Sequence, residues 1–176
     1  DLEFDAAFRA WPALVARGQR SLRVRAGVYP HQLDEVLAAA WASGDALPGG
    51  EGLITMGPLK IIADGSMGTR TAWCCEPYVD DPSTTGAPNL AASELEGLMG
   101  RAHAGGLECA IHAIGDRANA VALDAFEATG ARGSIEHAQL LRRSDVPRFA
   151  ALGVTASMQP HHLVDDRDTA SVMWAD

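Results

Sequence analysis

The chain has little positive charge and no long apolar run. Its 176 residues include 14 Lys and Arg against 23 Asp and Glu, which gives a formal charge of −9. Because binding to phosphates requires clustered basic side chains, this balance argues against a nucleic-acid partner. No apolar stretch approaches the roughly 20 residues that a membrane-spanning helix needs. We therefore expect neither nucleic acid nor a membrane as a partner.

The chain also has too few cysteines for a disulfide framework. There are three, of which Cys74 and Cys75 are adjacent, and this usage suits a reducing compartment. We therefore expect a cytoplasmic protein. With 47 % apolar and 21 % charged residues, the composition is that of a globular chain. No repeat, low-complexity tract or domain boundary divides residues 1–176.

The hydrophobic pattern predicts helices and strands in alternation. Helices are expected over 2–17, 32–43, 93–103, 116–129 and 145–152, and strands over 22–29, 59–63, 107–112, 133–137 and 154–158. This order is typical of a parallel α/β sheet, in which functional sites lie at the carboxyl ends of the strands. The long connection 64–90 is a candidate lid or substrate loop.

Three predicted strands carry a side chain suited to metal binding. Lys60 lies in the second, and His112 and His137 end the third and fourth. Their spacing is that of successive β/α units, so neighbouring strands are expected to bring them together. Neutral imidazole is the commonest metal ligand, and Zn²⁺ accepts two histidines plus oxygen ligands. The pKa of a buried lysine falls readily, and the neutral amine reacts with CO₂ to give a carbamate that can bridge two metals.

Each of these residues also has a structural interpretation. A single histidine at a strand end is more often a hydrogen-bonded structural residue, although two on consecutive strands favour a metal site. A lysine in a strand is usually exposed at an edge. The histidines of Pro160–His162 either line a site or form an exposed pair. The glycines near Asp64 match neither a dinucleotide-binding pattern nor a P-loop.

Three sequence blocks, in this order, resemble the amidohydrolase superfamily, and most closely its YtcJ-like branch, which includes N-substituted formamide deformylase. The blocks are Leu59-Lys60-Ile61-Ile62-Ala63-Asp64-Gly65-Ser66-Met67-Gly68-Thr69-Arg70-Thr71-Ala72, Ile111-His112-Ala113-Ile114-Gly115-Asp116-Arg117-Ala118, and Ile135-Glu136-His137-Ala138-Gln139. The resemblance implies a distorted TIM-like (β/α)₈ barrel with one or two divalent metals, usually zinc.

In such a barrel, residues 1–176 would form a single segment holding strands three to seven. The resemblance implies that Lys60 becomes the bridging carbamate and that His112 and His137 bind metal. The family's first-strand His-x-His pair and its eighth-strand aspartate, the general base, have no match here. Because five strands cannot close the barrel, we expect a partial barrel that is inactive alone. We expect this partial barrel to be completed by the rest of the same chain or to pair in a homodimer.

The expected function is metal-dependent hydrolysis of a carbon–nitrogen bond in a small-molecule amide, N-acyl or formamide substrate. Arg70 is a candidate for holding an anionic substrate group, with a structural salt bridge as the alternative. Gln159 and His161 are further candidates for substrate binding. Two other interpretations stay open: a non-catalytic flavodoxin-like binding module, and a barrel remnant that has lost its metal.

Overall fold

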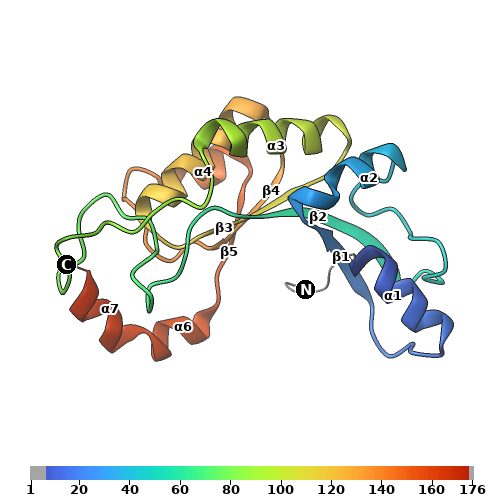
Figure 1. Cartoon of the computed structure of the whole chain (residues 1–176), viewed down its shortest axis with the longest axis horizontal. Helices are drawn as coiled ribbons and strands as arrows, with labels where there is room; N and C mark the ends of the chain where they lie inside the picture. The colour runs from blue at the N-terminus through green and yellow to red at the C-terminus, as the bar shows by residue number, and fades with distance from the viewer. Residues whose placement is uncertain (1–6, 175–176) are drawn as a thin grey trace.

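Five parallel strands form one sheet, ordered along the chain as β1-β2-β3-β4-β5 (Figure 1). The computed structural model describes residues 7–174. The strands are β1 Val24–Val28, β2 Ile54–Ile62, β3 Cys109–Ala113, β4 Gly133–His137 and β5 Thr155–Ser157. Each strand pairs in parallel with the next one along the chain. The predicted alternation and the α/β class are therefore confirmed.

Helices connect the strands and lie mainly along one side of the sheet, where α3 and α4 pack together (Figure 1). They are α1 Ala7–Ala16, the 3₁₀ turn η1 Pro30–Gln32, α2 Leu33–Ala38, α3 Ala92–Ala104, α4 Asp116–Thr129, α5 Val146–Leu152, α6 Pro160–Asp165 and α7 Arg167–Met173. Among residues 7–174, no helix combines the length and apolar character needed to span a membrane.

The second strand begins earlier than the sequence pattern predicted. It starts at Ile54 because residues 54–56 pair with β1, next to an irregularity in that strand's register. Gly57 and Pro58 concealed this half of the strand, since both residue types normally interrupt strands. Gly57 is required here: a Cβ would lie 2.9 Å from the backbone of Ala26.

Two predicted helices also differ from the structure. The helix expected over 32–43 is wrong beyond Ala38, because Ala40 has a φ of +55° and the chain turns there. Ser43 then donates from Oγ to the Gly57 carbonyl and accepts from the N–H of Glu108, so it joins β2 to the start of β3. The helix expected over 2–17 is observed from Ala7, and its first five residues lie outside the described part. Helices α6 and α7 were not predicted.

The two faces of the sheet differ in polarity. Ile61, Ile111 and Ile135 are in register on neighbouring strands, are at most 2 % exposed and belong to the main core. Because side chains alternate along a strand, Lys60, His112 and Glu136 fall on the opposite face. That face is polar toward the carboxyl ends of the strands.

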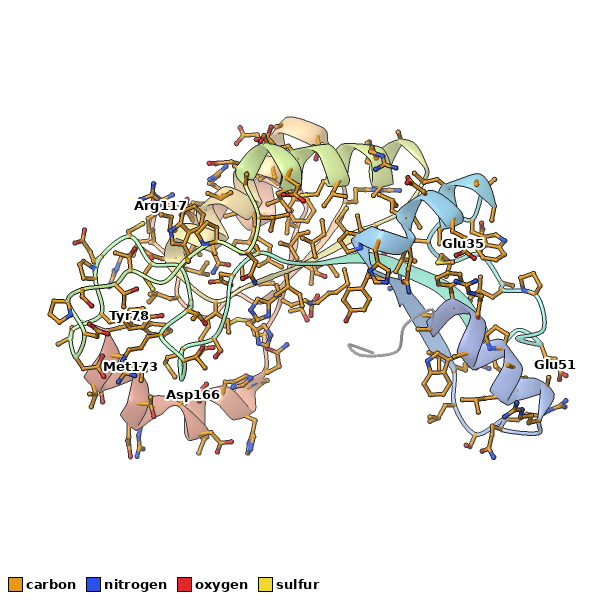
Figure 2. All side chains as sticks on the ribbon, viewed as in Figure 1. Glu35, Glu51, Tyr78, Arg117, Asp166 and Met173 are labelled. Carbon is orange, nitrogen blue, oxygen red and sulfur yellow. The ribbon has the colours of Figure 1, made fainter. Side chains whose placement is uncertain are left out.

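A second, smaller core joins the segment 64–90 to the C-terminal helix. Its buried members are Met67, Cys74, Tyr78 and Met173. The N–H of Val79 donates to the carbonyl of Met173 at 2.9 Å, and Figure 2 shows Tyr78 beside Met173 at the end of α7. Burial raises the pKa of the Cys74 thiol to about 11, so this cysteine packs as a small apolar residue.

Candidate metal centre

Two histidines from neighbouring strands meet at the carboxyl ends of β3 and β4. Their ring centroids are 4.6 Å apart, with the ring planes at 72°. The register pairs His137 with Ala113, so regular alternation would send its side chain to the face opposite His112. Instead, His137 has a φ of +72° and the next residue, Ala138, has a φ of +44°. Two consecutive non-glycine residues in the left-handed region are uncommon and cluster at functional sites.

His112 has one ring nitrogen engaged and one left over. Its Nε2 lies 3.0 Å from the carbonyl oxygen of Gly65 and 3.4 Å from Oδ1 of Asp64. A carbonyl oxygen can only accept, so Nε2 carries the proton. In the neutral ring, Nδ1 is then the basic atom. Histidines that bind metals usually donate their other N–H to a carbonyl or carboxylate in this way.

His137 is held in its neutral form. Burial, together with the neighbouring His112, Lys60 and His162, lowers its pKa to about 4, while Glu136 opposes the shift. Its Nδ1 atom is buried and has no hydrogen-bond partner among residues 7–174. A neutral imidazole with an unpartnered buried nitrogen is the chemical form that coordinates a metal.

Lys60 lies on the same face of the sheet as His112 and is also partly buried. Burial lowers the pKa of its amine, while the nearby Glu136 carboxylate raises it. Glu136 is itself fixed by two hydroxyls, with Ser134 Oγ at 2.5 Å and Ser157 Oγ at 2.6 Å. A lysine with a lowered pKa has a larger neutral fraction, which carbamate formation requires.

Asp64 joins the loops around this pair of histidines. Its carboxylate is fully buried and accepts the N–H groups of Trp73, Ile114 and Gly115 at 2.9 to 3.0 Å. Burial raises the pKa of the carboxyl, and the three N–H donors and His112 oppose that rise. The segment after β2 is thereby bonded to the turn after β3. Gly115 has no room for a side chain, since a Cβ would lie 2.0 Å from the Trp73 carbonyl oxygen.

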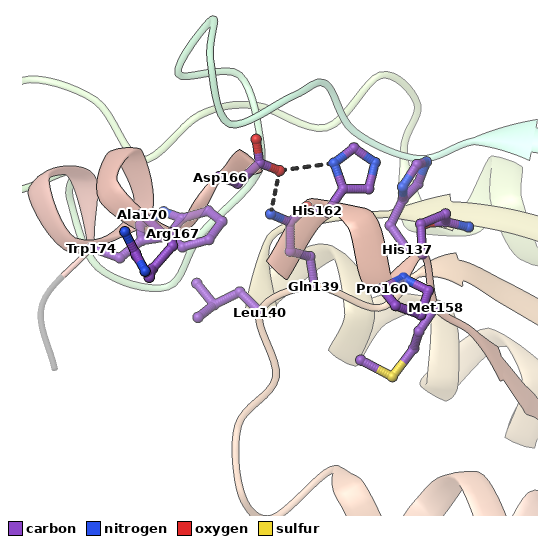
Figure 3. Close-up of a pocket in the computed structure, with 11 residues that line it drawn as sticks. His137, Gln139, Leu140, Met158, Pro160, His162, Asp166, Arg167, Ala170 and Trp174 are labelled. Carbon is purple, nitrogen blue, oxygen red and sulfur yellow. Dashed lines mark hydrogen bonds and ion pairs between the residues drawn. The ribbon is translucent and has the colours of Figure 1, made fainter. Parts of the chain in front are cut away.

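A cavity of about 440 Å³ opens next to His137 (Figure 3). It is lined by His137, Gln139, Leu140, Met158, Gln159, Pro160, His162, Asp166, Arg167, Ala170 and Trp174. The ring of His162 lies 5.6 Å from that of His137. Its Nδ1 is 2.9 Å from Oδ2 of Asp166, and the amide of Gln139 donates to the same oxygen at 3.1 Å.

The sequence model of the amidohydrolase family (Amidohydro_3) matches residues 2–173. The chain belongs to the amidohydrolase family. It is 33 % identical over 162 residues to "Putative amidohydrolase YtcJ" of Bacillus subtilis (strain 168), covering 90 % of this chain and 29 % of that protein. It is also 39 % identical over 123 residues to "Protein LONG AFTER FAR-RED 3" of Arabidopsis thaliana, covering 66 % of this chain and 21 % of that protein.

Two solved structures share the fold of this amidohydrolase segment. Both are described as an uncharacterized metal-dependent hydrolase, one from Pyrococcus furiosus and one from Pyrococcus horikoshii OT3. Each has a TM-score of 0.85, with 36 % and 39 % identity. The alignments cover 94 % and 96 % of this chain and 34 % of each neighbour. The segment therefore has the fold of part of a metal-dependent hydrolase barrel and spans about a third of these chains or less. This likeness favours the barrel over a flavodoxin-like module.

Of the three residues that the sequence suggested for substrate binding, the structure places one in the cavity wall and two elsewhere. Arg70 makes an ion pair with Asp80, from Nη2 at 2.5 Å and Nε at 3.2 Å, within the segment 64–90. His161 is 84 % exposed and pairs with Asp165, outside the cavity. Gln159 lines the cavity. The neighbour of His161, His162, is the histidine that faces His137.

Sequence reasoning missed three polar residues of the site, Asp64, Glu136 and Asp166, and left open whether His162 lines the site or is exposed. Two of them had a local signal. His162 and Asp166 are four residues apart, the spacing that puts side chains on one face of a helix. Asp64 lies two residues after the strand that carries Lys60. Its three donors come from residues up to 51 positions away, so no local pattern reveals them.

The donor set fits a divalent metal in part. Within residues 7–174, no three His, Cys, Asp or Glu side chains converge closely enough to hold an ion. His112 and His137 supply two imidazoles with a nitrogen to spare. A structural or catalytic zinc takes at least three protein ligands. The two imidazoles are therefore one ligand short of such a site within the described residues.

Proposed function

We propose that the full-length protein containing this segment hydrolyses a carbon–nitrogen bond in a small-molecule amide, N-acyl or formamide compound. The observation that carries the proposal is the pair of imidazoles at the ends of β3 and β4, 4.6 Å apart. Both are prepared for coordination, His112 by its bond to Gly65 and His137 by burial. Membership of the amidohydrolase family supports hydrolysis as the reaction class.

Each residue around the two histidines has a proposed role in holding or positioning the metal. His112 through Nδ1, His137, and Lys60 as its carbamate would hold one or two divalent ions, which we propose to be zinc. A bound metal of this kind lowers the pKa of water toward 7 and polarises a carbonyl. Asp64 keeps His112 and the turn after β3 in place. Glu136, fixed by Ser134 and Ser157, keeps a negative charge near Lys60.

The general base and the remaining barrel strands are proposed to come from elsewhere in the same chain, or from a second copy. The relatives support this, because the segment covers only 29 % of the Bacillus subtilis protein. The five strands form a sheet with β1 and β5 at its edges, which is too few to close an eight-stranded barrel. We therefore propose that the segment is inactive alone. A cytoplasmic location also remains a proposal.

The test uses the full-length protein purified with its natural metal. Metal content is measured by mass spectrometry, and hydrolysis is measured on a panel of formamides, N-acyl amines and lactams. His112→Ala and His137→Ala should each lose bound metal and at least 100-fold of turnover, since ligand loss removes the metal's contribution. His103→Ala, on the exposed side of α3, is the matched control and should behave like wild type.

Two results would overturn the proposal. One is full metal content and turnover in His112→Ala and His137→Ala, which would remove both residues from the metal site. The other is a wild-type protein that binds no divalent metal and hydrolyses no amide, which would identify a metal-free remnant of the barrel.

A further inference from the structure

We propose that His162 contacts the substrate, that Asp166 and Gln139 fix its orientation, and that its Nε2 accepts a hydrogen bond from a substrate N–H. The site would therefore select amides with an N–H group over substrates that lack one. This inference rests on the proposed function, because it assigns the recognition of the nitrogen side of the same scissile group.

The proton on the His162 ring is placed by its partner. Nδ1 lies 2.9 Å from Oδ2 of Asp166, and a carboxylate can only accept, so Nδ1 carries a proton. In the neutral ring, Nε2 is then an acceptor. The sequence spacing of four residues within one turn of helix makes this bond local and short.

Asp166 is fixed from two sides. Gln139 donates from Nε2 to the same Oδ2 atom at 3.1 Å, and Gln139 lies two residues after His137. The backbone N–H of Asp166 donates to the His162 carbonyl at 2.9 Å, and its own carbonyl accepts from the N–H of Ala170 at 2.7 Å. The His162 ring is thereby held relative to the end of β4 as well as to α7.

The position of His162 puts it beside the reacting group. Its ring is 5.6 Å from the ring of His137, and both line the 440 Å³ cavity (Figure 3). The proposal places the substrate carbonyl beside His137 and the attached nitrogen on the side of His162. The apolar side chains of Leu140, Met158 and Trp174 then surround what the nitrogen carries.

A second acceptor in the same wall supports selection of an N–H donor. Gln159 uses its Nε2 on the Ser157 carbonyl at 2.9 Å. Its Oε1 is buried and has no hydrogen-bond partner within residues 7–174. The cation in the wall, Arg167, is bonded to Asp168 and is 74 % exposed. The wall also holds one buried donor without a partner within residues 7–174, the indole N–H of Trp174. The acceptors on the His137 side, His162 Nε2 and Gln159 Oε1, are satisfied by a substrate N–H and not by an ester oxygen.

The experiment compares N-butylacetamide with butyl acetate on the metal-loaded full-length protein. The two probes share their size and acyl group and differ at the N–H. Both kcat/KM and the dissociation constant by calorimetry are measured for wild type, His162→Ala and His161→Ala. His161 is the matched control, because it has the same four-residue pairing with an aspartate but is exposed.

We expect His162→Ala to weaken binding of the amide, and to lower its kcat/KM, by roughly 10-fold, the equivalent of one hydrogen bond. Both quantities should change by less than about twofold for the ester. His161→Ala should leave both probes unchanged. Asp166→Asn should reduce the preference for the amide and move the His162 proton to Nε2, since an amide group can donate to Nδ1. Nitrogen-15 NMR of labelled histidine reports that proton directly.

If His162→Ala loses affinity and kcat/KM equally for the amide and the ester, the inference is overturned. Failure of both probes to bind would also overturn it. A retained amide preference in that variant would do the same. The proposed function fails differently, through absence of metal and of turnover in wild type. The calorimetric preference and the NMR signature are read without turnover, so the two failures are distinguishable.

Discussion

Replacing Asp64 with alanine removes the shared acceptor of three backbone N–H groups, those of Trp73, Ile114 and Gly115. A buried N–H left without a partner costs about 1–3 kcal/mol. The three together therefore give roughly 3–9 kcal/mol. Burial of the carboxylate itself opposes folding, as the raised pKa of Asp64 indicates. We therefore expect Asp64→Ala to lower the free energy of unfolding by about 3–5 kcal/mol, near the lower end of that range. This is a large part of the 5–15 kcal/mol that stabilises a typical domain.

The assay is urea unfolding of the metal-free full-length protein, with the free energy of unfolding compared between variants. Asp64→Asn keeps one oxygen acceptor and should lose roughly half as much. Asp168→Ala is the control, because the Asp168 side chain is 86 % exposed, and it should change stability by less than about 0.5 kcal/mol. If Asp64→Ala loses under about 1 kcal/mol, the role assigned to the buried carboxylate is wrong.

Asp64→Asn should also weaken the metal site. Its Oδ1 lies 3.4 Å from Nε2 of His112, and loss of such an outer partner typically costs 10–100-fold in metal affinity. Competition with a coloured chelator measures the affinity of the folded variant. An unchanged affinity would show that the Gly65 carbonyl alone orients His112.

Three further predictions concern pH, packing and charge. Burial lowers the pKa of His137 from 6.5 to about 4, so its contribution to the stability of the metal-free protein is complete above pH 6.5 and is lost as the pH falls toward 4. The loss is at most roughly 2–3 kcal/mol and should shrink in His137→Gln, as urea midpoints at pH 7 and pH 4.5 would show. Gly115→Ala should cost at least about 2 kcal/mol by thermal unfolding, because its Cβ meets Trp73, whereas Gly97→Ala, with nothing within 4 Å, should not destabilise. Arg70→Gln should leave KM for an anionic amide within twofold, since its guanidinium is already bonded to Asp80.

The sequence predicts the features of this fold that depend on local pattern. Apolar periodicity places the five strands, and strand ends place His112 and His137 at one edge of the sheet. The resemblance to the amidohydrolases, which the family match confirms, adds what periodicity alone leaves open. The sequence pattern did not predict the first half of β2, because Gly57 and Pro58 interrupt its alternation. The strand nevertheless pairs with β1 on both sides of these two residues.

The features that the sequence does not predict depend on contacts between distant segments. The left-handed backbone of His137 has no signal in its residue type, yet it turns the ring toward His112. The choice between His161 and His162 depends on the direction in which α6 leaves β5, which neither residue encodes. Asp64 acquires its role from donors on two other segments, so its importance appears only in three dimensions.

The small core that joins the segment 64–90 to α7 changes how the entrance to the site can move. Tyr78 is 1 % exposed and Met173 is 7 % exposed, so a shift of the segment alone would bring both into water. The segment and α7 therefore travel as one unit, with Asp166 and Gln139 bonded at its border. Loops that fluctuate freely move in nanoseconds to microseconds, whereas packed units hinge in microseconds to milliseconds. We therefore expect this cavity to open on the slower of these two timescales.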